Sequence, residues 1–184
     1  MTVIIREACA TDLPAVMGIE RVSFSDPWTL GMFAAHLAPQ PGAQFMVAEQ
    51  SGAIVGFAMS QAVMDESELL NLAVDPAARN LGVGAALLDA MMVRCMTAGA
   101  ATMWLEVRAS NTSARGLYES RGFVSAGLRK RYYESPREDA IVLRADLSLA
   151  VRNESVTAPV PSLVTDRGER ILSTASHLPR QEIK

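Results

Sequence analysis

Between residues 70 and 97 the chain reads as a strand, a proline stop, a pair of glycines and a long helix. Residues 70–76 are Leu-Asn-Leu-Ala-Val-Asp-Pro, and Pro76 ends the apolar run because it has no N–H to donate to a neighbouring strand. We expect the helix to begin just after Gly82 and Gly84. Glycine lets a backbone approach a ligand closely, and the free N–H groups of a helix N-terminus favour an anion. The segment therefore predicts a phosphate-binding turn.

Two alternatives to this turn stay open. The dinucleotide fingerprint of a Rossmann unit also uses closely spaced glycines, and Glu106 lies near the place where that motif has an acid. Two features disfavour it: Leu87 occupies the third glycine position, and residues 76–81 separate the strand from the first glycine, whereas the fingerprint turn follows its strand at once. The second alternative is structural, with glycines that only ease a strand-to-helix turn.

Composition narrows the class of protein. A chain of 184 residues with 49% hydrophobic content can bury one good core. The net charge of -3 gives no broad basic face, so nucleic acid is not an expected partner. No apolar run approaches the roughly 20 residues that span a bilayer, and the N-terminus lacks the layout of a signal peptide. We therefore expect a cytoplasmic protein without a membrane partner; we expect a monomer, although the sequence does not determine the oligomeric state.

The cysteines and histidines do not form a metal or disulfide pattern. Cys9 and Cys95 are far apart in the sequence, and neither His36 nor His177 lies near a cysteine or the other histidine. We expect no metal site and no disulfide. Each cysteine is interpreted as a small buried hydrophobic residue.

Hydrophobic periodicity predicts the element order β-α-α-β-β-β-α-β-α-β-β. Strands are expected at residues 3–6, 43–50, 54–63, 68–75, 101–108, 123–133 and 139–147. Helices are expected after a cap at Thr11-Asp12, after Pro27, from the glycine pair to Gly99, and from Ser110 or Asn111 to Gly122. A tight hairpin turn is expected at Ser51-Gly52. This order predicts an α/β fold with a single mixed, mostly antiparallel sheet flanked by helices.

The character of the sequence changes near residue 150. The segment from there to residue 184 contains no aromatic residue, holds Pro159, Pro161 and Pro179, and shows no sustained period. We therefore predict a folded domain over residues 1–148 and a flexible tail over 149–184.

The motifs, taken in order, resemble the GCN5-related N-acetyltransferase superfamily, whose nucleotide motif is Gln/Arg-x-x-Gly-x-Gly/Ala. Residues 79–84, Arg-Asn-Leu-Gly-Val-Gly, satisfy that motif. Further segments are similar to its bacterial ribosomal-protein-alanine branch: residues 70–76, 104–111, 117–123, 132–133 and 137–141. The resemblance covers roughly residues 1–148 and implies the α/β fold described above.

This resemblance implies an enzyme that acetylates the N-terminal alanine of a small-subunit ribosomal protein. The acetyl group would pass directly from acetyl-CoA, the co-substrate, to the peptide within a ternary complex, without a metal. Two alternatives stay open. One is an acetyltransferase for lysine or a small amine on the same fold, and the other is a CoA-binding module without catalysis.

The resemblance also implies where CoA binds. Its pyrophosphate would lie on the loop of residues 80–85, and its pantetheine arm would pair with the backbone of the preceding strand, which needs no particular side chain. Asn111 matches a family position near the pantetheine, and a helix N-cap explains it equally well. The residues expected to bind the cofactor are Leu72, Ala73, Val74, Arg79, Asn80, Leu81, Gly82, Val83, Gly84, Ala85 and Asn111. Positions 80 and 85 often carry basic side chains in relatives. Here they are Asn80 and Ala85, so Arg79 is the cation nearest to the expected pyrophosphate.

Two residues match the catalytic positions of the superfamily. Acetyl transfer needs a neutral amine, so a base must take its proton, and Glu106 matches the family's proton acceptor. Without the resemblance, a surface or salt-bridged glutamate is the better interpretation. Tyr118 matches the proton donor that protonates the departing CoA thiolate, and its alternative is a core tyrosine beside Leu117.

The acceptor peptide is expected to lie in a groove between two aromatic walls. The resemblance implies that Trp28, with Phe24, forms one wall and Tyr132, with Tyr133, the other. Each of these aromatic side chains can equally belong to the core.

Overall fold

The structure, a computed structural model, describes residues 2–150. The elements are β1 (Val3–Glu7), α1 (Leu13–Ser23), α2 (Leu30–Leu37), β2 (Ala43–Gln50), β3 (Ala53–Val63), β4 (Glu66–Val74), α3 (Val83–Thr97), β5 (Thr102–Arg108), α4 (Thr112–Glu119), β6 (Val124–Glu134), β7 (Arg137–Asp146) and α5 (Leu147–Ala150). The predicted α/β class and the order of strands and helices are confirmed; the short α5 was not predicted. The tail predicted over residues 149–184 lies outside the described residues, except for the last two residues of α5.

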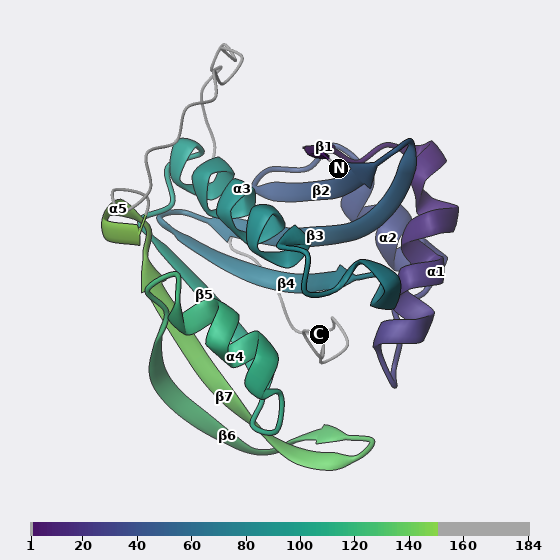
Figure 1. Ribbon diagram of the computed structural model, residues 1–184. Helices are drawn as coiled ribbons and strands as arrows, with labels where there is room; N and C mark the ends of the chain where they lie inside the picture. Colours follow the sequence, from purple (N-terminus) through teal and green to yellow (C-terminus); the bar gives the residue numbers. More distant parts are fainter. Residues whose placement is uncertain (1, 151–184) are drawn as a thin grey trace.

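The strands form one mixed sheet in the order β1-β2-β3-β4-β5-β7-β6. Only β4 and β5 run parallel, and they pair over a short stretch, residues 66–68 with residues 102–104. Beyond that stretch the two strands diverge, as Figure 1 shows on the side away from α5. Within the described residues, the backbone of β4 from Leu69 onward therefore has no strand partner on the side of β5.

A bulge in β4 decides which side chains face the divergence. Met59 and Ser60 of β3 are adjacent, but their partners in β4 are Asn71 and Leu69, so Leu70 is an extra residue. An extra residue restarts the alternation of faces. Leu72 and Val74 consequently pack on the face of the sheet that α3 covers.

Helices cover the sheet from both faces (Figure 1). Helices α3 and α4 enclose one apolar cluster, which includes Leu88, Leu105 and Tyr118. Helices α1 and α2 contact strands β2 to β4 and enclose a second cluster, in which Phe33 packs edge-on against Phe57 with ring centroids 5.6 Å apart. Strand β6, at the edge of the sheet, is exposed along most of its length.

The two turns predicted at glycine residues are present, but the predicted start of α3 needs a correction. Ser51 and Gly52 have φ angles of 52° and 81°, which confirms the tight hairpin turn. Helix α3 begins at Val83, between the two glycines and not after them. Gly82 adopts a left-handed conformation with φ 81° as the N-cap, so the helix can start with the next residue.

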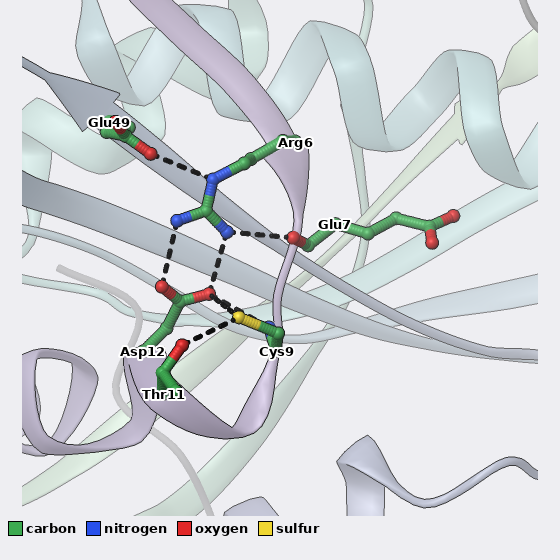
Figure 2. A network of polar contacts seen from close by, with 6 residues as sticks. All are labelled: Arg6, Glu7, Cys9, Thr11, Asp12 and Glu49. Atoms are coloured by element: carbon green, nitrogen blue, oxygen red, sulfur yellow. Dashed lines mark hydrogen bonds and ion pairs between the residues drawn. The ribbon is translucent and has the colours of Figure 1, made fainter. Parts of the chain in front are cut away.

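A polar network joins β1, β2 and the start of α1 (Figure 2). Arg6 donates from Nη1 and Nη2 to the two carboxylate oxygens of Asp12, at 2.7 and 2.8 Å, and from Nε to Glu49 at 2.9 Å. Asp12 also accepts from the backbone N–H of Cys9. The carboxylate of Asp12 is thus engaged here, and it makes no capping hydrogen bond to α1. The expectation that Cys9 is buried is wrong, since it lies exposed beside this network, whereas Cys95 is buried as expected.

Replacing Asp12 with Asn should destabilise the protein by about 2 kcal/mol, because a nearly buried carboxylate loses its fork of charge-assisted hydrogen bonds. Arg6 holds the pKa of Asp12 far below its usual range. This stabilisation is therefore complete above the unfolded-state pKa of about 3.9 and is lost as the pH falls below it. Urea unfolding at pH 7 should show the full difference between the two proteins, which should shrink as the pH falls from about 4 toward 2. Equal stability at pH 7 would contradict this account.

Candidate functional site

A cavity of about 540 Å³ lies at the turn from β4 into α3 and extends to α4. It is lined by Leu72, Val74, Arg79, Asn80, Gly82, Val83, Gly84, Ala85, Arg108, Ser110, Asn111, Ser113, Ala114, Leu117 and Tyr118. Every residue expected to bind the cofactor lies here except Ala73, which is buried on the opposite face, and Leu81, which is 63% exposed. The structure thus brings β4, the end of β5, the turn before α3, and helices α3 and α4 together around a single space.

The turn itself presents backbone groups to this cavity. Asn80 and Gly82 both have positive φ angles, 62° and 81°, so the chain reverses sharply before α3. The first N–H groups of a helix have no acceptor within the helix, and those of α3 belong to residues that line the cavity. At Gly84 a Cβ atom would lie 3.5 Å from Val74 and 3.6 Å from Leu117. These are ordinary van der Waals distances, so the space for a ligand is that of the cavity itself, and the N–H groups at the turn are suited to a bound anion.

Arg79 lines the cavity, but other parts of the protein hold its guanidinium group. Its Nε donates to the carbonyl oxygen of Val74 at 3.0 Å, and its Nη2 donates to the hydroxyl of Ser23 at 3.2 Å. Arg79 therefore ties the turn to β4 and to the end of α1. Its positive charge still lies at the wall of the cavity, whereas Arg108, which also lines it, is paired with Glu138 at 3.2 Å.

Asn111 serves as the N-cap of α4. Its Oδ1 accepts a hydrogen bond from the backbone N–H of Ala114 at 3.1 Å, which confirms the interpretation as a helix cap. The same residue lines the cavity, so its predicted position near a pantetheine arm is compatible with its capping role.

Tyr118 lies at the inner end of the site and belongs to the core as well. Its side chain is fully buried and packs edge-on against Phe123 with ring centroids 5.6 Å apart. Within residues 2–150 its hydroxyl has no hydrogen-bond partner. Burial raises the pKa of this hydroxyl far above its ordinary value of about 10, and a tyrosine is protonated at neutral pH in either case. The side chain therefore presents a protonated hydroxyl at the wall of the cavity.

Glu106 lies on the other face of the sheet, since its neighbours Leu105 and Val107 point into the cluster under α3 and α4. Its Oε2 accepts a hydrogen bond from the Tyr132 hydroxyl at 2.5 Å, and its Oε1 pairs with Nε of Arg129 at 2.8 Å. Its side chain is only 14% exposed. The structure thus brings Glu106 together with Tyr132, and it places both on the face opposite to Tyr118.

A second cavity, of about 340 Å³, lies on the side of Tyr132. It is lined by Ser25, Asp26, Arg108, Tyr132, Tyr133, Glu134 and Ser135. The connection between α1 and α2 and the turn between β6 and β7 form its walls, and the Ser25 hydroxyl joins them by donating to the Ser135 carbonyl oxygen at 2.6 Å. Arg108 lines both cavities, and its guanidinium group lies 4.2 Å from the ring centre of Tyr133. The two cavities therefore share one side chain at the end of β5.

Trp28 lines neither cavity. Its side chain is 3% exposed and packs against Phe33 in the cluster under α1 and α2, with ring centroids 5.6 Å apart. Its backbone N–H donates to the buried carboxylate of Glu20 at 2.8 Å. The indole contributes to the core in this structure, and its role in binding an acceptor stays a prediction.

The sequence analysis did not identify several residues that line the cavities, among them Arg108. It also did not identify Arg129 as the ion-pair partner of Glu106. Arg108 carried a usable signal, because it follows Glu106 at the next position on the same face of β5. Arg129 carried none, because the pairing of β6 with β7 is irregular on both sides of it.

Among residues 2–150, no group of three His, Cys, Asp or Glu side chains is arranged to hold a metal ion. In the same part of the chain, no helix is long and apolar enough to cross a membrane.

Comparisons with known proteins agree with this architecture. The sequence model of the Acetyltransferase (GNAT) family matches residues 13–123. A ribosomal protein bS18-alanine N-acetyltransferase of Escherichia coli K12 is 41% identical over 143 residues, which cover 76% of this chain and 94% of that protein. The crystal structure of the ribosomal-protein-S18-alanine N-acetyltransferase from Escherichia coli matches with a TM-score of 0.74 and 39% identity, covering 84% of this chain and 100% of the other. Ard1 from Thermoplasma volcanium matches with a TM-score of 0.73 and 29% identity, covering 79% and 98%.

Proposed function

The chain belongs to the GNAT family of acetyltransferases, and from this premise we propose that it acetylates the N-terminal alanine of a small-subunit ribosomal protein, with acetyl-CoA as donor. Its Escherichia coli relative is named for this reaction on bS18. One observation carries the proposal. The glycine turn, Asn111 and Tyr118 line a single cavity, while Glu106 lies on β5, whose last residue, Arg108, lines the same cavity. Residues 1–148 would carry the activity, and the cytoplasm, where ribosomes are found, is the proposed location.

The first cavity suits CoA in three respects. The N-terminus of α3 and the turn before it offer backbone N–H groups to a pyrophosphate. Arg79 adds positive charge at the wall. The backbone of β4 beyond Leu69 has no strand partner toward β5 in the described part of the chain, so it can pair with an extended arm of amides.

Glu106 is the proposed base. An attacking amine needs a free lone pair, so an ammonium must first lose a proton. An N-terminal amine has a pKa of roughly 7.7 to 8.0, against about 10.4 for lysine, so a carboxylate acting directly or through water can complete the deprotonation. The neutral nitrogen then forms a bond to the thioester carbonyl carbon and becomes positively charged. When the amide forms, this nitrogen loses a second proton, which replaces the one that the proposed acid gives to the leaving thiolate, so Glu106 holds only the first proton.

Tyr118 is the proposed acid. When the carbon–sulfur bond breaks, CoA leaves as a thiolate that takes up one proton. Tyr118 lines the same cavity, and its hydroxyl is protonated at neutral pH, so it has a proton to give. Tyr132 and the second cavity are the proposed site for the acceptor peptide, on the face where Glu106 lies.

A pair of peptides separates this proposal from its main alternative. One peptide begins with a free alanine, and its twin is blocked at the N-terminus and contains a lysine. Thiol release from acetyl-CoA should occur with the first peptide and not with the second. Turnover of the blocked peptide alone would favour a lysine acetyltransferase, and CoA binding without any turnover would favour a binding module.

Replacing Glu106 with Gln should lower kcat by about 100-fold or more, because the base is lost. The dissociation constant of acetyl-CoA should change little, since Glu106 does not line the first cavity. Steady-state kinetics and calorimetric titration measure the two quantities. Glu119→Gln, which removes a carboxylate from an exposed ion pair with Arg115, is the matched control and should keep normal activity. A kcat of Glu106→Gln equal to that of the wild type at every pH from 6 to 9 would exclude Glu106 as the base.

Replacing Tyr118 with Phe should lower kcat at least about tenfold while the melting temperature stays close to that of the wild type. The ring and its packing on Phe123 are retained, and the deleted hydroxyl has no hydrogen bond to lose within residues 2–150. Thermal unfolding and steady-state kinetics test the two statements. A loss of stability with a normal rate would instead assign Tyr118 to the core alone.

A further inference from the structure

Arg129 covers the one carboxylate that the proposed reaction needs. Its Nε lies 2.8 Å from Oε1 of Glu106, and its side chain is 57% exposed while that of Glu106 is 14% exposed. The other oxygen of Glu106 accepts from the Tyr132 hydroxyl. An incoming amine therefore meets Glu106 where Arg129 now lies.

Of the two partners of Glu106, Arg129 is the one that can leave. Tyr132 is half-buried, and its ring packs edge-on against Tyr133 with centroids 5.2 Å apart. Arg129 is held by an ion pair at the surface and by a loose contact with the Tyr132 ring, 5.4 Å from its centre. Water competes for the mostly exposed guanidinium group of Arg129, and an ammonium group that takes its place leaves the nearly buried Glu106 paired with a cation. A second cation can displace Arg129 at small cost.

Glu68 offers Arg129 another carboxylate close by. It lies on β4 opposite Trp104 of β5, two residues before Glu106 on the same face of that strand. Removal from water and the negative charge of Glu106 raise the pKa of Glu68, and Arg129 lowers it. Two carboxylates thus act on a single guanidinium group, so this patch can accept one more positive charge. Glu66 and Arg144, which both contact Trp104, carry opposite charges and offset each other.

We propose that Arg129 occupies, in the free protein, the subsite for the acceptor's ammonium group, and that it moves toward Glu68 when the peptide binds. The subsite between Glu106 and Glu68 then holds the charged N-terminus until Glu106 takes its proton. Arg129 is thus a positioning residue that competes with the acceptor and makes no contact with the reacting carbonyl. This inference rests on the proposed function of Glu106.

The test uses CoA in place of acetyl-CoA, so that the peptide binds without reacting. Calorimetry at about 0.15 M salt, where the Debye length is about 8 Å, measures the Kd of a peptide with a free N-terminal alanine and of its N-acetylated twin. In Arg129→Gln the free peptide should bind about three- to fivefold more tightly, in line with the small contribution of an exposed ion pair. The acetylated twin carries no charge at its N-terminus, so its Kd should not change. Lys130→Gln removes the same charge one residue away and should leave both values unchanged.

Three results would overturn the proposal. Weaker binding of the free peptide to Arg129→Gln would mean that Arg129 helps to hold the acceptor. An equal gain for both peptides would mean that Arg129 only obstructs the groove, and an equal gain in Lys130→Gln would mean a general effect of charge. Absence of turnover by the wild type with acetyl-CoA would instead contradict the proposed function, so the two failures are distinguishable.

Glu68 is tested in a double-mutant cycle. Glu68→Gln should weaken binding of the free peptide in the wild-type background, because Arg129 loses its second partner. The same change should have a smaller effect in the Arg129→Gln background. Equal effects in both backgrounds would overturn the proposed movement toward Glu68.

Discussion

The site depends on the short parallel pairing of β4 with β5. Residues 66–68 and 102–104 pair, and the two strands then diverge (Figure 1). An extra residue at Leu70 turns the following side chains, so Leu72 and Val74 face the first cavity, while toward β5 the backbone of β4 presents groups that no strand within residues 2–150 pairs. Such groups are costly unless they meet water or a ligand. A ligand that extends the sheet at this place replaces the missing strand, which explains how a continuous sheet can contain a binding site.

The divergence also separates the two proposed catalytic groups onto opposite faces of the sheet. Tyr118 lies on α4, over one face, and Glu106 lies with Tyr132 on the other. The environments of the two groups differ accordingly. The Tyr118 hydroxyl is fully buried and stays protonated, whereas Glu106 is held by two donors near the surface. The proposed proton donor and the proposed proton acceptor thus have different surroundings, with Arg108 lining the cavities on both sides.

Local sequence patterns predicted much of this arrangement. The glycine turn, the cap at Asn111 and the alternation of β5 depend on residues close together in the chain, and the structure confirms each of these elements. Contacts between distant segments were not predictable in this way. The pair of Arg129 with Glu106 depends on the irregular register of β6 against β7, and the bulge at Leu70 depends on how β4 meets β3. The burial of Trp28 likewise follows from packing under α1 and α2, since an aromatic residue in a loop is compatible with a groove or a core.

Glu20 fixes α1 and the loop at Trp28 relative to strand β4. This carboxylate on α1 is completely buried, and burial raises its pKa to about 7. It accepts one hydrogen bond from the backbone N–H of Trp28, at 2.8 Å, and one from the side chain of Asn71, at 3.0 Å. Asn71 directly follows the bulge at Leu70, so the same irregularity that turns Leu72 toward the cavity also turns Asn71 toward α1. A buried carboxyl group is expensive to desolvate, and its two hydrogen bonds offset part of that cost only when β4, α1 and the loop at Trp28 keep their relative positions. The bulge therefore sets which side chains of β4 face the first cavity. Through Glu20 it also anchors the loop that leads to the second cavity.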